Sequence, residues 1–236
     1  MKKAELTPTA HNTFRIVYGD QGKEPGCDFG EAIRTSEEQE ARSEIEKACN
    51  TRFEAFQALM ELIPDSTDME LEWEDDNSRD ALLLINLSAV DHFLVGDFEM
   101  CAAMLEMLLE LDPEDHFEVS KRLAYTYVAL EEYELFDEVI NDISDKYPDK
   151  GILSLWCEYR RAGAIPEGEL RRFKRSFAVY FDEFIAASHP VDEAYLKDIE
   201  GEHPSRESLA RELWLQTEHL WTLYPGFIEA IKEKKA

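Results

Sequence analysis

The sequence has few residues that interrupt helices. Its 236 residues include 10 glycines and 9 prolines, which favours helices over many tight turns. Hydrophobic residues make up 44% of the chain and aromatic residues 11%. A chain of this length and composition can bury a substantial core and is not a disordered tail. We expect one domain, or at most two.

Cysteines are also few and widely separated. Cys27, Cys49, Cys101 and Cys157 form no C-x2-C pair, so the sequence predicts neither a zinc site nor a redox pair. No run reaches the roughly 18 apolar residues of a membrane helix. The charged start is not followed by the apolar run of a signal peptide. We therefore expect a cytoplasmic protein that does not contact a membrane.

Positive charge is scarce and negative charge abundant. Lysine and arginine total 25, aspartate and glutamate total 52, and the net charge is -27. Such a surface argues against a nucleic-acid partner, because binding a phosphate backbone needs positive charge. It favours either simple solubility or a basic partner.

Residues 81–148 read as two helical hairpins in tandem, Leu82–Pro113 and Phe117–Pro148. When Gly96 is aligned with Glu131, the two hairpins match at a distance of 35 residues. Small, aromatic, aliphatic and proline positions then coincide. The aligned pairs are Ala89 with Ala124, His92 with Tyr127, Phe98 with Tyr133, Cys101 with Phe136, Leu105 with Ile140, Leu108 with Ile143, and Pro113 with Pro148.

This pattern resembles the tetratricopeptide repeat (TPR) family, whose 34-residue repeat has W-x2-L-G-x2-Y, then A-x3-F, then P. The matching residues are Gly96-Asp97-Phe98 and Pro113 in the first hairpin, and Leu123, Ala124, Tyr127 and Pro148 in the second. The sequence departs from the family in three ways. The tryptophan position holds Ile85 and Ser120, the second small position holds Cys101 and Phe136, and 113–117 contains one extra residue. A generic pair of helical hairpins is the alternative.

The resemblance implies an all-α fold, a right-handed superhelix of antiparallel helix hairpins. It also implies a concave face that binds a peptide, which would be lined by Asn86, Val90, Phe93, Lys121 and Tyr125. Asn86 could clamp a peptide backbone through its amide, and Lys121 could meet a carboxylate. The alternative is that Val90, Phe93 and Tyr125 pack against another helix.

The segments before the repeats predict a tail, a capping helix and a minor sheet. We expect 1–35 to be a tail with a short strand at 13–18 and a loop at 19–30. Within 36–76, we expect a long helix that begins at Ser36 and ends at Pro64, followed by an acidic connector. Residues 69–74 alternate apolar and acidic side chains, which predicts a strand that pairs with 13–18.

The segment after the repeats, 149–236, predicts divergent helical hairpins that pack with the repeats as one domain. Helices are expected over 152–161, from Pro166 to Ile185, from His189 to Ile199, and from Ser205 or Ser208 onwards. The chain's main basic cluster lies here and consists of Arg160, Arg161, Arg171, Arg172, Lys174 and Arg175. This cluster could bind an anionic partner, or pair with the protein's own carboxylates within the chain or in a dimer. We favour self-pairing.

The sequence shows no reaction centre. It lacks the His-Glu-x2-His and Gly-x-Ser-x-Gly motifs. Glu200 and His203 have the spacing of a di-iron ligand pair, but Gly201 and Pro204 prevent a helix there. We therefore expect no catalytic residue, no cofactor and no metal. The two function classes that remain are a scaffold that binds a protein or peptide, and an acidic regulator that binds basic proteins or imitates nucleic acid.

Overall fold

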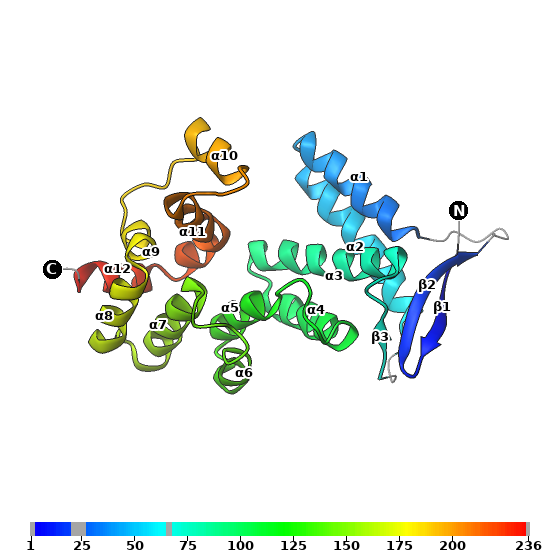
Figure 1. Ribbon diagram of the computed structural model, residues 1–236, viewed down its shortest axis with the longest axis horizontal. Coiled ribbons are helices and arrows are strands. Elements are labelled where there is room, and N and C mark those ends of the chain that lie inside the picture. The colour runs from blue at the N-terminus through cyan, green and yellow to red at the C-terminus, as the bar shows by residue number, and fades with distance from the viewer. Residues whose placement is uncertain (1–2, 20–26, 65–67, 235–236) are drawn as a thin grey trace. The chain divides into compact units, whose positions relative to one another are not determined.

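The computed structural model describes residues 3–19, 27–64 and 68–234, which form twelve helices and one small sheet (Figure 1). The expected helical character is confirmed. The chain divides into two compact units, residues 1–126 and 127–236. The boundary between the units falls inside helix α5 (Ser120–Leu130), so the second predicted repeat is divided between them. The packing of 149–236 against both repeats therefore stays a prediction. Within the described residues, no helix is both long enough and apolar enough to span a membrane.

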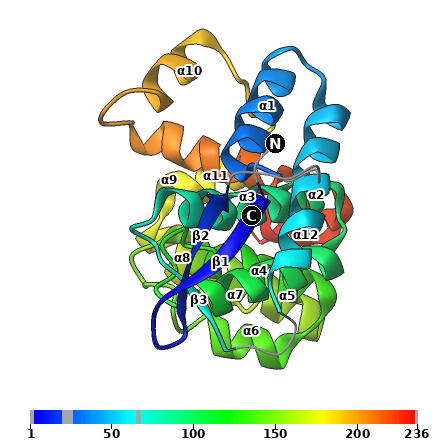
Figure 2. The same cartoon turned by 90° about the vertical axis from the view of Figure 1, so that its right-hand side faces the viewer.

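The sheet lies in the first unit and has the order β1-β2-β3 (Figure 2). Strands β1 (Lys3–Ala10) and β2 (Thr13–Gly19) form an antiparallel hairpin, and β3 (Glu70–Leu71) runs parallel to β2. The predicted pairing between 13–18 and 69–74 is thus confirmed over two residues of β3. The predicted loose tail is wrong over 3–10. Leu6 of β1 lies opposite the buried Ile16, so this segment pairs along the hairpin.

Helix α3 (Asp76–Val95) is the centre of the first unit. It contacts α1 (Phe29–Ala41), α2 (Ile45–Leu62), α4 (Phe98–Leu111) and β2. Two hydrogen bonds fix its first turn to the sheet. The Ile16 amide donates to Ser78 Oγ at 3.0 Å, and Asn77 Nδ2 donates to the Ile16 carbonyl at 3.0 Å. The sheet therefore sets where α3 begins.

The predicted capping helix is two helices, and Ser36 does not begin it. Helix α1 begins after Asp28, whose carboxylate accepts from the Glu31 amide at 3.0 Å. Ser36 is buried inside α1, where its hydroxyl bonds to the Ile33 carbonyl. The chain breaks at Ser43, which has a φ of 60°, before α2 starts. The loop expected over 19–30 is helical from Phe29, and its residues 20–26 lie outside the described residues.

A carboxylate also begins α3. Asp75 is its N-cap, and the Asp75 carboxylate accepts from the Ser78 amide at 3.0 Å. An aspartate side chain satisfies a helix-end amide and places negative charge at the positive end of the helix dipole. The acidic connector before α3 is therefore in part a capping segment.

The two predicted repeat turns have the same backbone hydrogen bonds. After α3, Gly96 has a φ of 80°, its amide donates to the Phe93 carbonyl, and the Asp97 amide donates to His92. After α5, Glu131 has a φ of 64°, its amide donates to Val128, and the Glu132 amide donates to Tyr127. This is a left-handed helix end at both places, 35 residues apart. The two aligned residues, Gly96 and Glu131, therefore have the same type of backbone conformation.

The second unit contains the remaining helices around an aromatic core. Helix α11 (Arg206–Leu223) contacts α9 (Ala178–Phe184), α10 (Glu193–Ile199) and α12 (Pro225–Glu233). Of the two predicted starts, Ser205 and Ser208, it is Ser205 that caps α11. The buried core includes Trp156, Phe181, Phe184, Trp221 and Phe227. The elements are α6 (Tyr133–Val139), α7 (Pro148–Ala162), α8 (Glu167–Ser176), α9 (Ala178–Phe184), α10 (Glu193–Ile199), α11 (Arg206–Leu223) and α12 (Pro225–Glu233).

Two predicted helix boundaries in the second unit are wrong. The aromatic helix expected from Pro166 to Ile185 is broken at Phe177, whose φ of -132° and ψ of 49° end α8 and precede α9. The short helix expected from His189 begins at Glu193, because the Asp192 side chain caps it through the Tyr195 amide. The backbone conformation of Phe177 and the side-chain cap of Asp192 therefore set these helix ends, and the apolar pattern does not.

Candidate functional site

The residues expected to line a peptide-binding groove lie on α3 and α5, and several are already engaged. Asn86 Oδ1 accepts from Arg122 Nη1 at 2.9 Å, and Lys121 Nζ lies 2.5 Å from Glu118 Oε2. Val90 is half-buried, whereas Phe93 and Tyr125 are 4% and 3% exposed. The Phe93 ring packs against that of Phe98 at 5.9 Å. Burial of the two rings favours the alternative in which they are core residues, and peptide binding by this set stays a prediction.

The predicted basic cluster is largely paired with carboxylates of its own unit. Arg160 lies 2.6 Å from Glu131, and Arg161 lies 2.8 Å from Asp137. Arg171 and Arg172 reach Glu167 and Glu169, which precede them on α8. Lys174 Nζ sits 5.0 Å from the ring centre of Phe181, and Arg175 is exposed. These contacts favour self-pairing over an anionic partner.

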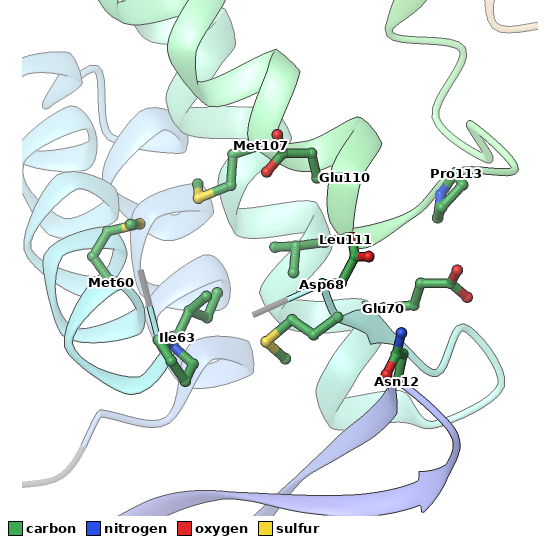
Figure 3. A pocket seen from close by; sticks show the side chains of 11 residues that line it. Asn12, Met60, Ile63, Asp68, Glu70, Met107, Glu110, Leu111 and Pro113 are labelled. Atoms are coloured by element: carbon green, nitrogen blue, oxygen red, sulfur yellow. The ribbon is translucent and has the colours of Figure 1, made fainter. Parts of the chain in front are cut away.

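A pocket of about 690 Å³ lies in the first unit, where three segments meet (Figure 3). The end of α2 forms one wall, the end of α4 forms a second, and β3 with the β1–β2 turn forms a third. Both helices end here because a proline follows, Pro64 after α2 and Pro113 after α4. The lining residues are Asn12, Met60, Ile63, Pro64, Asp68, Met69, Glu70, Met107, Glu110, Leu111 and Pro113.

The pocket has an apolar floor and an acidic rim. Met69 and Leu111 are buried, and Met60, Ile63 and Met107 are half-buried, so thioether and aliphatic groups make up the floor. The exposed rim carries the carboxylates Asp68, Glu70 and Glu110 beside the amide of Asn12. Methionine side chains adapt to ligands of varied shape. The pocket therefore suits a ligand that is apolar along its length and positively charged at its end.

A ring stack joins two of the pocket walls. Trp73, which follows β3, stacks on His116 in the loop after α4, with ring centres 4.1 Å apart and planes at 6°. His116 Nδ1 lies 2.7 Å from Oδ1 of Asp112, and this hydrogen bond raises the pKa of His116 above its ordinary value of 6.5. The stack and the hydrogen bond together hold the end of β3 beside the end of α4.

Sequence reasoning did not find this pocket. Met60 falls within the helix expected from Ser36 to Pro64, and Met69 falls within the strand expected over 69–74, so each residue was interpreted only within its own segment. The available signal was the placement of methionines and prolines at the ends of α2 and α4. Only the tertiary fold brings those ends to β3.

No group of His, Cys, Asp and Glu residues that could hold a metal ion occurs in the part of the chain that the structure describes. No family model matches the sequence, and the comparisons with curated proteins and with solved structures found no match.

Proposed function

We propose that the protein is a non-catalytic helical scaffold that binds a basic, partly apolar segment of a partner protein in the pocket between α2, α4 and β3. The observation that carries the proposal is the combination of a methionine and aliphatic floor with a rim of Asp68, Glu70 and Glu110. The volume lies in the range of about 300–1,000 Å³ typical of ligand pockets, which is enough for several side chains.

Lysine and arginine have the chemistry that this pocket complements. Each has an apolar stem that can lie along the floor and a charged head that can reach the rim. The negative ends of the α2 and α4 dipoles also lie at the pocket, and they add to the attraction for a cation. The net charge of -27 would draw a basic partner to the protein over a longer range.

The proposal includes a TPR-like right-handed superhelix. Its support is the repeated turn at Gly96 and Glu131 and the burial of aligned residues, since Ala89 and Ala124 are both fully buried, and Leu108 and Ile143 nearly so. A concave face with Asn86 and Lys121 would then be a second contact with the same partner. A cytoplasmic location is also part of the proposal, and the four free cysteines support it.

Fluorescence anisotropy with a designed peptide tests the pocket. The probe carries two lysines flanked by leucine and methionine, and the matched peptide carries glutamates in place of the lysines. We expect the lysine peptide to bind and the glutamate peptide not to bind. Glu110→Lys should weaken binding about tenfold or more, because it places a positive charge at the rim.

Glu54→Lys is the matched control, since Glu54 is exposed on α2 and does not line the pocket. It makes the same change in net charge, so it should weaken binding far less than Glu110→Lys. Equal losses in the two variants, with binding that disappears at high salt, would instead support the acidic regulator that binds basic proteins through overall charge. Binding to a pocket with an apolar floor should persist at high salt.

A further inference from the structure

His116 links two walls of the pocket between α2, α4 and β3. Its ring stacks on Trp73, which follows β3, and its main chain belongs to the loop that follows α4. Glu70 of β3 lies around the same cavity as Glu110 and Pro113 at the end of α4 (Figure 3). The contacts that hold this ring therefore also hold together the two segments that bring carboxylates to the rim.

Both ring nitrogens of His116 face a carboxylate oxygen. Nδ1 lies 2.7 Å from Oδ1 of Asp112, and Nε2 lies 3.3 Å from Oε2 of Glu114. The other oxygen of Asp112 accepts from the His116 backbone amide at 3.0 Å, which keeps this carboxylate beside the ring. A neutral imidazole has one N–H and leaves one of the two carboxylates without a donor, whereas the imidazolium donates to both. The geometry therefore fits the protonated ring.

The charges that act on the ring from the facing segment are those of Glu74 and Arg79. Glu74, next to Trp73, is a third carboxylate close enough to favour the protonated ring. The guanidinium of Arg79 lies 6.0 Å from the centre of the Trp73 ring and is paired with Asp76. In the part of the chain that the structure describes, no lysine or arginine forms an ion pair with any of the three carboxylates around His116. The histidine proton is thus the positive charge that joins the two segments.

The direction of the pH dependence follows from this arrangement. The hydrogen bond to Asp112 raises the pKa of His116, and the charges of Asp112, Glu114 and Glu74 raise it further against a small effect of burial. Because the folded-state pKa lies above the ordinary 6.5, the stabilisation is fully present below pH 6.5 and is lost as the pH rises through the folded-state value. Above that value the three carboxylates repel one another across the two segments, and the ring loses its cation–π attraction to Trp73.

A second ring stack in the chain differs in its charges. In the second unit, His189 stacks on Trp214 with ring centres 3.9 Å apart and planes at 18°, and its Nδ1 lies 2.7 Å from Oε1 of Glu183. Arg211 also donates to Glu183, with Nη2 3.1 Å from Oε2. A guanidinium stays charged throughout the pH range of folded proteins, so this carboxylate has a permanent cationic partner. Asp112 has no such partner among the described residues, and its pairing depends on the histidine proton.

We propose that His116 is a pH-sensitive latch that holds β3 beside the end of α4 and so controls the pocket between α2, α4 and β3. With the ring protonated, the carboxylates of both segments face one ligand. With the ring neutral, β3 is held less firmly and the rim no longer converges. The effect of the latch on binding rests on the proposed function, whereas its effect on β3 can be measured without a ligand.

NMR of the imidazole and of the methionine methyl groups tests the latch in the free, full-length protein. We expect the His116 ring to titrate with a midpoint above pH 6.5. The ε-methyl signal of Met69, which precedes β3 and lines the pocket, should shift with the same midpoint, whereas that of Met104 on α4, outside the lining, should not. In His116→Gln, which keeps a polar side chain without a titrating proton, the Met69 signal should not change between about pH 6 and about pH 8.5.

Two further variants separate the titration of the ring from its effect on β3. Asp112→Asn removes the charge and keeps an oxygen that can accept from the ring, so the midpoint of His116 should fall. Trp73→Leu removes the stack, so His116 should still titrate beside Asp112 while Met69 no longer follows it. His203→Gln is the matched control, because it removes an exposed histidine from a turn of the second unit and should leave the Met69 titration unchanged.

The lysine peptide then tests the effect of the latch on binding. We expect it to bind about fivefold tighter at about pH 6 than at about pH 8.5, which is the lower end of typical coupling between two sites, and equally at both values in His116→Gln. Repulsion between the imidazolium and the peptide lysines alone would weaken binding at the lower pH. The direction of the change therefore distinguishes the latch from a simple effect of charge.

The outcomes that would overturn the latch differ from those that would overturn the proposed function. A Met69 signal that ignores the titration of His116, or that still follows it in Trp73→Leu, refutes the latch whether or not the peptide binds. Equal or weaker peptide binding at the lower pH refutes control of the pocket by the latch. A Met69 signal that follows His116 as expected, with no peptide binding at either pH, supports the latch and counts against the proposed function alone.

Discussion

The hairpin of α3 and α4 and the hairpin of α5 and α6 share a turn but differ in their helices. Both turns place one residue in the left-handed region, Gly96 at a φ of 80° and Glu131 at 64°, and both close with the same pair of backbone hydrogen bonds. Helix α4 then runs for 14 residues, whereas α6 runs for 7. The turn geometry is repeated although the turn residue is not.

Local helix propensity explains the shorter α6. The second half of α4 reads Leu105-Glu-Met-Leu-Leu-Glu-Leu111, in which every residue is a strong helix former. The aligned stretch reads Ile140-Asn-Asp-Ile-Ser-Asp-Lys146, and its asparagine, aspartate and serine side chains compete for backbone hydrogen bonds. Asn141 does so, since its Nδ2 donates to the Asp137 carbonyl at 2.8 Å. Turn position and helix length are therefore set by different residues.

An ion pair joins the first hairpin to helix α2, and the second hairpin has no residue equivalent to the aspartate of that pair. Asp91 of α3 forms an ion pair with Arg52 of α2, which also reaches Glu40 of α1 at 2.7 Å. The residue aligned with Asp91 in α5 is the neutral Thr126. Burial alone would lower the pKa of Arg52, but hydrogen bonds to Asp91 and Glu40 raise it above its ordinary value.

Arg52→Met should have the largest effect on the first hairpin. It strands Asp91, whose side chain is 17% exposed, and we expect a loss of about 3 kcal/mol in the free energy of unfolding. Chemical denaturation followed by circular dichroism measures this loss. The control is Arg42→Met, because the pair of Arg42 with Glu38 is exposed and should be worth less than about 0.5 kcal/mol. Equal losses in the two variants would refute the role of the buried pair.

Helix α3 carries two buried serines, Ser78 and Ser88. The Ser78 hydroxyl is hydrogen-bonded, whereas the Ser88 hydroxyl has no partner among the described residues. Ser78 accepts from the Ile16 amide and donates to Asp75 at 2.9 Å, so Ser78→Ala should cost about 1–3 kcal/mol. Ser88→Ala removes a hydroxyl without a partner among the described residues and should cost nearly nothing. Thermal unfolding of both variants makes the comparison. A large loss in Ser88→Ala would show that its hydroxyl is bonded within the protein.

We predict that Gly96→Ala and Glu131→Gly, at the equivalent positions of the two turns, have opposite effects on the free energy of unfolding. Gly96→Ala places a Cβ at a φ of 80° and should cost about 1–2 kcal/mol. Glu131→Gly relieves the same strain and should leave stability unchanged or raise it by up to about 1 kcal/mol. Glu132→Gly is the control, because Glu132 has a φ of -81° and gains nothing from glycine. If Glu131→Gly and Glu132→Gly destabilise equally, the two turns are not equivalent.

The smallest effect concerns the length of α6. Replacing Asn141 and Asp142 with alanine should extend the helix past Val139 and add less than about 1 kcal/mol, since each change improves helix propensity by a fraction of that amount. Backbone chemical shifts of residues 140–144 report the extension. Unchanged shifts would mean that tertiary packing, rather than local propensity, ends α6.

The sequence predicted the elements that depend on local signals. Glycine and proline marked the ends of α3 and α4, Ser205 marked the start of α11, and alternation marked β2 and β3. It missed β1, because Pro8 weakens the strand pattern and only pairing with β2 makes the segment a strand. It also merged α1 and α2 into one helix, since nothing in the side chain of Ser43 requires the φ of 60° that separates them.

The pocket depends on tertiary contacts and could not be predicted from one segment at a time. Glu110 lies on a helix and Glu70 on a strand, and both appeared as part of a general acidic surface. Their common place at the rim needs the sheet order and the helix packing together. Likewise, only the tertiary fold shows that the Ser88 hydroxyl has no partner among the described residues.

Methyl NMR of methionine tests the central claim most directly. The chain has six methionines. Met60, Met69 and Met107 line the pocket with the acidic rim, whereas Met100 and Met104 lie on α4 and do not line it. On addition of the lysine peptide, we predict that the ε-methyl signals of the three pocket methionines shift together and those of Met100 and Met104 do not. Uniform shifts, or none at Met60, Met69 and Met107, would contradict binding at this pocket.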